Sequence, residues 1–167
     1  QVSSLSATKL AMLTTAQVRA LTASQVKAMN ASNLGNLSSG QLAALTATQA
    51  AVLTTAQISS LSTDQLAGIA NTSVAALSTS QLAAIDSAKL AKMTSAQIRA
   101  MSTLQVSALS TTQVGAMTSD QVSAMTAAQI GSLTKGAVAV LRTDAVASLT
   151  VAQAKAFTTA QIAALTT

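Results

Sequence analysis

The feature that most constrains the fold is an eight-residue period that runs through the whole chain. Starting at Leu5, every eighth residue up to Leu165 is large and apolar, 21 positions in all. A continuous α-helix turns about 100° per residue, so eight residues overshoot two full turns by about 80°. A stripe with this period would wind around a straight helix, and supercoiling corrects only smaller mismatches. The backbone must therefore change direction once per repeat.

Each repeat also has a fixed internal pattern. We label the large apolar position a and the octad abcdefgh. Position f is again a large aliphatic residue except at Ala50 and Ala154. Position b is Thr, Ser, Asn or Asp except at Ala70 and Arg142, and position e is Gln in most repeats. Positions g and h are mostly small residues, which allow helices to approach closely.

The b and e positions predict a helix start in nearly every repeat. A Thr or Ser followed three residues later by Gln is a capping box, in which each side chain bonds the backbone of the other residue. Thr14 and Gln17 have this spacing. The residue before the cap, Leu13, is then placed to pack on Val18 as a hydrophobic staple. Cap, box and staple together indicate repeated short helices.

Two repeats lack a capping residue at position b. Ala70 is followed by Asn71, and Arg142 is followed by Thr143. Because Asn and Thr are good capping residues, we expect the cap to slip by one residue in both repeats.

The expected fold is all-α, a solenoid of very short capped helices with one helix per octad. Each helix would have about one and a half to two turns, too short to be stable alone. Stacking the helices would bury positions a and f in one continuous core. A β-solenoid is the alternative, but Ala, Leu, Met and Gln favour helix, and a and f do not alternate as a strand requires.

The array is expected to be one continuous domain over residues 1–167. No linker or charge block divides it, and it begins and ends in the middle of a repeat, at Gln1 and Thr167. This predicts either a piece of a longer array or a subunit that stacks head-to-tail with identical neighbours.

The composition argues against several functional classes. Only 8% of residues are charged, the net charge of +5 is spread thinly, and the chain has no Trp or Tyr. A nucleic-acid surface needs clustered basic residues and stacking aromatics. No apolar run is long enough to cross a membrane. The chain has no His and no Cys, which removes the commonest nucleophiles, bases and zinc ligands.

The four acidic residues have structural interpretations. Asp64, Asp120 and Asp144 occupy position d, where a carboxylate meets a helix N-terminus favourably, and Asp86 occupies the cap position. A Ser–Lys pair at Ser87 and Lys89 is the kind of coincidence that a Ser-rich sequence produces. We therefore predict no catalytic, cofactor-binding or metal-binding residue, no cofactor and no enzyme activity.

The units LTTAQVRA, LTASQVKA and LTTAQISS resemble the A-L-T-T-A-Q-[IV]-A octapeptide arrays of large, secreted bacterial surface proteins of the adhesin-like type. The resemblance implies a secreted or cell-surface location and a scaffolding or adhesive role, and it carries over no functional residue.

From these observations we expect a structural protein that forms an extracellular filament or the stalk of a bacterial surface protein. It would self-associate head-to-tail or laterally. The alternative is an adhesive binding module that presents the solenoid surface to a host, a matrix or a carbohydrate. The many Thr and Ser hydroxyls leave O-linked sugars open, and the number of octads per turn is not predicted.

Overall fold

The computed structural model describes residues 7–165, and this range is helical with no β-strand. Its helices have four to seven residues, and one lies in each octad. This confirms the predicted all-α fold and shows that the β-solenoid alternative is wrong for the described range. Most of the helices have five or six residues, so they are somewhat shorter than the sequence predicts.

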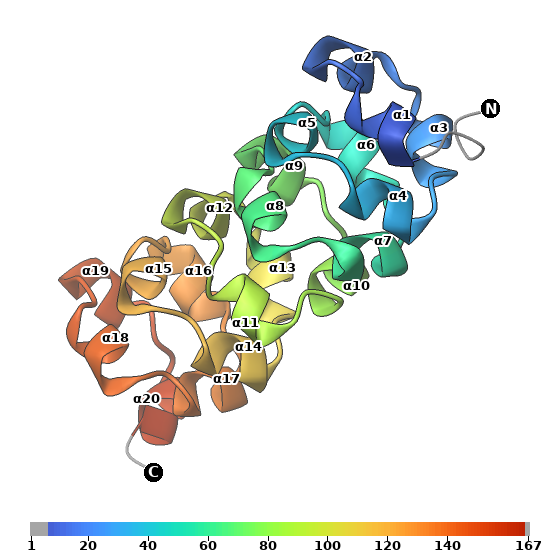
Figure 1. The fold of residues 1–167 in the computed structure, drawn as a ribbon. Helices are drawn as coiled ribbons and strands as arrows, with labels where there is room; N and C mark the ends of the chain where they lie inside the picture. The colour runs from blue at the N-terminus through green and yellow to red at the C-terminus, as the bar shows by residue number, and fades with distance from the viewer. Residues whose placement is uncertain (1–6, 166–167) are drawn as a thin grey trace. The chain divides into compact units, whose positions relative to one another are not determined.

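The chain forms two compact units, Gln1–Ile85 and Asp86–Thr167. Figure 1 labels their helices. In its described part, unit 1 contains α1 (Ala7–Ala11), α2 (Thr15–Ala20), α3 (Ala23–Lys27), α4 (Ala31–Gly35), α5 (Ser39–Ala43), α6 (Ala47–Ala51), α7 (Thr55–Ser60), α8 (Thr63–Gly68), α9 (Asn71–Ala75) and α10 (Thr79–Ala83). In its described part, unit 2 contains α11 (Ser87–Leu90), α12 (Ser95–Ala100), α13 (Thr103–Ser107), α14 (Thr111–Gly115), α15 (Ser119–Ser123), α16 (Ala127–Ser132), α17 (Lys135–Ala139), α18 (Thr143–Ala147), α19 (Val151–Ala154) and α20 (Thr159–Leu165).

Within each unit, every helix packs against the helix three positions further along the chain. In unit 1 the pairs run from α1 with α4 to α7 with α10, and in unit 2 from α11 with α14 to α17 with α20. One turn of the solenoid therefore contains three octads. This arrangement stacks the helices in three columns, so residues 24 apart occupy equivalent places in successive turns.

The chain changes direction at position b. Thr14 has extended backbone angles, φ −70° and ψ 159°, and its side chain accepts a hydrogen bond from the Gln17 amide. Its carbonyl accepts from the Val18 amide at 3.0 Å, which closes the first turn of α2. No residue in the described range has a positive φ. An extended capping residue therefore redirects the chain at each repeat, without a left-handed glycine.

The expected slip of the cap at Ala70 and Arg142 is wrong. Both residues remain at the N-cap position with extended angles and no side-chain cap bond, and their helices begin at Asn71 and Thr143. Moving the cap would shift positions a and f out of register with the stacked turns. Burial of a side chain such as Val74, 1% exposed, contributes about 1.5–3 kcal/mol, whereas one cap contributes about 1 kcal/mol.

The core consists of the a and f side chains, as the period predicts. Leu42, Leu66, Leu61 and Ile98 are among the side chains that are at most 1% exposed. Most of the described Gln side chains at position e are buried as well, and Gln57 is only 1% exposed. A buried polar side chain in nearly every repeat requires hydrogen-bond partners.

Candidate functional site: a glutamine ladder and an adjoining pocket

The buried Gln side chains bond at both ends. The Oε1 atom of Gln49 accepts from the Thr46 amide at 2.8 Å, which completes the capping box. Its Nε2 atom donates to the carbonyls of Val18 at 3.1 Å and Leu21 at 2.6 Å, about one turn earlier in the solenoid. The last carbonyls of a helix have no partner inside that helix. One side chain thus satisfies the start of its own helix and the end of another.

The same arrangement recurs along both units, and together these contacts form what we call the glutamine ladder. In each case the shortest bond, 2.6–2.7 Å, joins Nε2 to the carbonyl of the position-a residue 28 places earlier. The ladder residues with this contact are Gln41, Gln49, Gln57, Gln65 and Gln81 in unit 1, and Gln121, Gln129, Gln153 and Gln161 in unit 2.

Sequence reasoning assigned these glutamines to the capping box and missed their second role. A signal was present, because a capping box accepts Glu as well as Gln. All 15 glutamines of the chain lie at position e, and all four acidic residues are Asp, so Glu never takes this place. A carboxylate could accept from the cap amide but could not donate to the carbonyls. The complete absence of Glu therefore indicates that the amide nitrogen is required.

Six described repeats have another residue at position e, namely Lys9, Asn33, Ser73, Lys89, Ala137 and Ala145. Three of them show how the ladder changes without Gln. Ser73 is shorter, yet its Oγ still donates to the carbonyl of Leu45, 28 residues earlier, at 2.8 Å. Ala137 and Ala145 have no donor, so in unit 2 two successive contacts of the ladder are missing.

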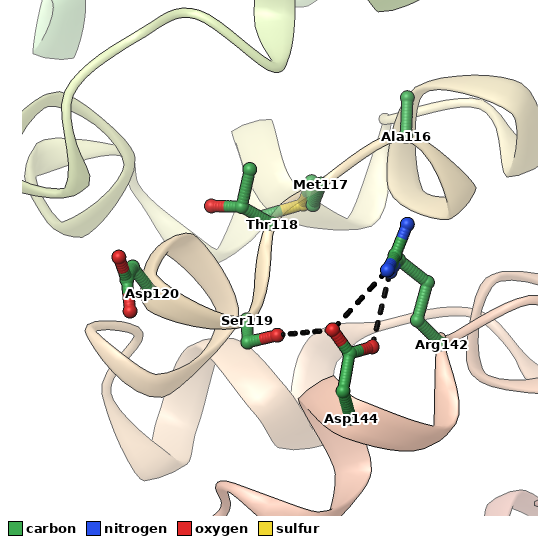
Figure 2. A pocket seen from close by; sticks show the side chains of 7 residues that line it. All are labelled: Ala116, Met117, Thr118, Ser119, Asp120, Arg142 and Asp144. Atoms are coloured by element: carbon green, nitrogen blue, oxygen red, sulfur yellow. Dashed lines mark hydrogen bonds and ion pairs between the residues drawn. The ribbon is translucent and has the colours of Figure 1, made fainter.

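A pocket of about 240 Å³ lies beside the second of these gaps. Its walls come from the α14–α15 junction, from α15 and from α18, and Figure 2 shows its lining side chains: Ala116, Met117, Thr118, Ser119, Asp120, Arg142 and Asp144.

An ion pair dominates this pocket. Arg142 Nε and Nη2 donate to Asp144 Oδ1 and Oδ2 at 3.0 and 3.2 Å, and Ser119 Oγ donates to Asp144 Oδ2 at 2.7 Å. Figure 2 shows these bonds converging on Asp144, whereas Asp120 lies apart from them. The two charged side chains are more than half exposed. Screening by solvent therefore limits what the pair contributes to stability.

The hydrogen bonds around Asp144 set its protonation. Arg142 first, and then Ser119, lower the pKa of the Asp144 carboxyl to about 2, and the same pair raises the pKa of Arg142. A general base works best with a pKa near the operating pH. The Asp144 carboxylate is therefore too weak a base at neutral pH to activate the Ser119 hydroxyl, and the trio does not resemble a nucleophile with its base.

The acidic residues that the sequence analysis considered, and Lys89, lie at helix starts, where they have structural roles. Asp86 caps α11, accepting from the Lys89 amide at 2.8 Å, and this bond lowers the pKa of Asp86. The Lys89 ammonium lies 3.4 Å from the same carboxylate. Asp64, Asp120 and Asp144 lie in the first turns of α8, α15 and α18.

The described residues also bear on metal binding and on membrane insertion. Within residues 7–165, no three His, Cys, Asp or Glu side chains gather in a way that would hold a metal ion. The helices of the same range are all too short or too polar to cross a membrane.

The fold and its ladder define the class: an α-solenoid of octapeptide repeats, with three short helices in each turn of either unit. The family model described as the ALTTAQ repeat matches residues 82–119 and 106–135. Residues 82–135 therefore carry the ALTTAQ repeat, which confirms the octapeptide resemblance there. The comparisons with curated proteins and with solved structures gave no match.

Proposed function

We propose that the chain is a structural protein, a repeat-built segment of an extracellular filament or of the stalk of a bacterial surface protein. The observation that supports this proposal is the glutamine ladder. In most repeats the largest polar side chain bonds the protein's own backbone, so it serves the stacking of turns and is withdrawn from ligand binding. Solenoid units of this kind add stability through nearest-neighbour contacts and extend along one axis.

The surface supports self-association, either head-to-tail or lateral. The exposed positions are mainly Thr, Ser and Ala, and charged residues make up only 8% of the chain. Neighbouring solenoids would therefore meet little like-charge repulsion. The extracellular location is part of the proposal, and the A-L-T-T-A-Q resemblance and the absence of Cys are consistent with it.

Negative-stain electron microscopy of the purified chain, combined with light scattering over a concentration series, tests this proposal. We expect filaments or bundles of uniform width, and a mass that rises with concentration. Single particles of monomer mass at every concentration would contradict it. A matched variant, Thr112→Asp with Thr159→Asp, adds exposed charge without touching a cap or the core, and it should weaken lateral assembly.

The pocket beside α18 favours a second candidate, an adhesive module for carbohydrate. Its hydroxyl, carboxylate and guanidinium groups are of the kinds that bond sugar hydroxyls. Screening the chain against immobilised glycans tests this function, with Asp144→Ala as the comparison. Binding that is equal in both proteins, or absent in both, would exclude the pocket.

A further inference from the structure

The two missing contacts of the glutamine ladder are adjacent in unit 2. Contacts are present at Gln121 and Gln129 before the gap and at Gln153 and Gln161 after it. The intervening position-e residues are Ala137 in α17 and Ala145 in α18. We call residues 134–149, which contain both of these positions and lack both ladder contacts, the unstitched segment.

The gap leaves backbone groups without the partners that they have in other repeats. By the spacing of the ladder, the carbonyls 28 residues before Ala137 and Ala145 belong to Leu109 and Met117. Among the described residues no side chain donates to either carbonyl, whereas Met101 and Met125 each receive a Gln amide at 2.7 Å. Ala137 and Ala145 are each 1% exposed, so both positions lie inside the stack, where the other repeats place a Gln side chain.

The starts of both helices are weakened as well. Thr134 caps α17 through the Ala137 amide at 3.1 Å, but no Gln returns a bond to the Thr134 amide. Arg142 provides no side-chain cap for α18. A short helix depends on such end contacts, since it has few internal bonds.

The contacts that replace the ladder here are exposed. Asp144 bonds Ser119 across the turns and pairs with Arg142, and both charged side chains are more than half exposed. Exposed pairs of this kind contribute little because water competes for them. They do not compensate for two buried amide contacts.

We infer that the unstitched segment is a built-in joint of the solenoid, which opens locally while the repeats on both sides remain packed. The flanking repeats stay attached through Gln129 on one side and through Gln153 and Gln161 on the other. Opening separates α17 and α18 from α14 and α15, the helices of the preceding turn on which they pack, so the array can bend there without unfolding. The inference does not depend on the proposed function.

Limited trypsin digestion of the full chain under native conditions tests the joint, because Lys135 and Arg142 both lie in the unstitched segment. Two other exposed sites lie in repeats that keep a ladder contact. Gln129 binds the carbonyl of Arg99, and Lys155 is the C-cap of α19, the helix that contains Gln153. Cleavage that follows local opening reports the population of the open state. We expect the first cuts at Lys135 and Arg142. Equal rates at all four sites, or first cuts at Lys155, would overturn the inference.

Hydrogen exchange separates a joint from ordinary fraying of a chain end. Fraying lowers protection progressively towards the end, whereas the joint makes the amides of α17 and α18 exchange faster than those of α19 and α20. Protection that falls steadily from α16 to α20 would contradict the joint.

Restoring the ladder should close the joint. Ala137→Gln with Ala145→Gln should slow cleavage at Arg142 by about tenfold, since buried unpaired groups carry a penalty of this order. Ala152→Gln is the matched control, because it adds Gln at an exposed position of α19, and it should leave the rate unchanged. Unchanged cleavage in a double variant that keeps its helical circular dichroism would refute the mechanism. If that variant does not fold, Gln153→Ala tests the mechanism instead, because it removes the ladder contact to the Met125 carbonyl. Trypsin should then cleave at Lys155 faster than in the parent chain. An unchanged rate at Lys155 would count against the joint.

Discussion

The glutamine ladder predicts a large difference between two chemically identical substitutions. In Gln49→Ala, the buried side chain loses its bond from the Thr46 amide and its bonds to the carbonyls of Val18 and Leu21. Gln17 forms the same type of capping box with Thr14 but is exposed. Comparing the two variants isolates the turn-to-turn contact from the cap.

The expected cost of Gln49→Ala comes from the groups that it leaves unpaired. The Val18 carbonyl keeps its bond from the Leu21 amide at 3.2 Å. The groups that lose their Gln49 partner are therefore the Thr46 amide, the Leu21 carbonyl and the Arg19 carbonyl, whose bond is longer at 3.3 Å. A buried group without a partner costs about 1–3 kcal/mol. Because Thr46 is only partly buried, we expect a total of about 3 kcal/mol. Gln17→Ala should cost about 0.5–1 kcal/mol, since water replaces the exposed bond.

Urea unfolding followed by circular dichroism at 222 nm measures both variants. The difference of about 2 kcal/mol corresponds to a Tm lower by about 4–8 °C for Gln49→Ala in a chain of this size. Equal losses in the two variants would refute the role of the turn-to-turn bonds. A loss at Gln49 below about 1 kcal/mol would indicate that cap formation accounts for its whole effect.

Gln49→Glu tests the direction of the same bonds. The introduced carboxylate would face carbonyl oxygens in a buried site, which raises its folded-state pKa above the unfolded value of about 4.3. Below that unfolded value the protonated acid can donate a bond, so the stability it provides is present. That stability is lost as the pH rises through the folded-state pKa. Unfolding midpoints should therefore fall with rising pH relative to the parent chain, and a parallel pH profile would exclude the donor role.

Three further outcomes follow from burial, close approach and protonation. Leu61→Asp should cost more than about 4 kcal/mol because it places a charge in the core, whereas Ser62→Ala should cost about 1 kcal/mol as a lost cap; urea unfolding would contradict both if the costs were equal. Gly131→Ala should destabilise because its Cβ would lie 2.9 Å from the Ala156 backbone oxygen. Gly40→Ala should stabilise by about 0.5–1 kcal/mol, because its Cβ would make only an ordinary contact with Ser38 Oγ at 3.9 Å; thermal melts check both signs. The Asp144 carboxyl should titrate near pH 2 by NMR. The stability that its ionised form contributes is present above the unfolded-state pKa and should be lost as the pH falls through the folded-state pKa of about 2.

The sequence was sufficient to predict the capped helix that each regular repeat forms. Thr14 and Gln17 specify a helix start, and the staple partners Leu13 and Val18 follow from the same pattern. The number of octads per turn was not readable, because the octad is nearly identical in all three columns of the stack. No residue within an octad shows whether that octad packs on the second, third or fourth octad further along the chain. The cap at Arg142 was mispredicted for a related reason, since local capping preference gives way to the register that the stacked core imposes.

The choice of Gln over Glu connects the local pattern to the stacking. A helix of five residues leaves most of its end carbonyls unpaired, and in a stack of such helices these carbonyls are buried between turns. Satisfying them requires a donor at the same place in every repeat, beside a cap amide that requires an acceptor. A primary carboxamide is the side-chain group that provides both from one carbon. The shorter Ser73 side chain keeps only the donor bond to the Leu45 carbonyl, and Ala145 has neither bond and lies beside the pocket. The period of eight therefore determines where the helices break, and the amide at position e determines how tightly the broken helices are joined.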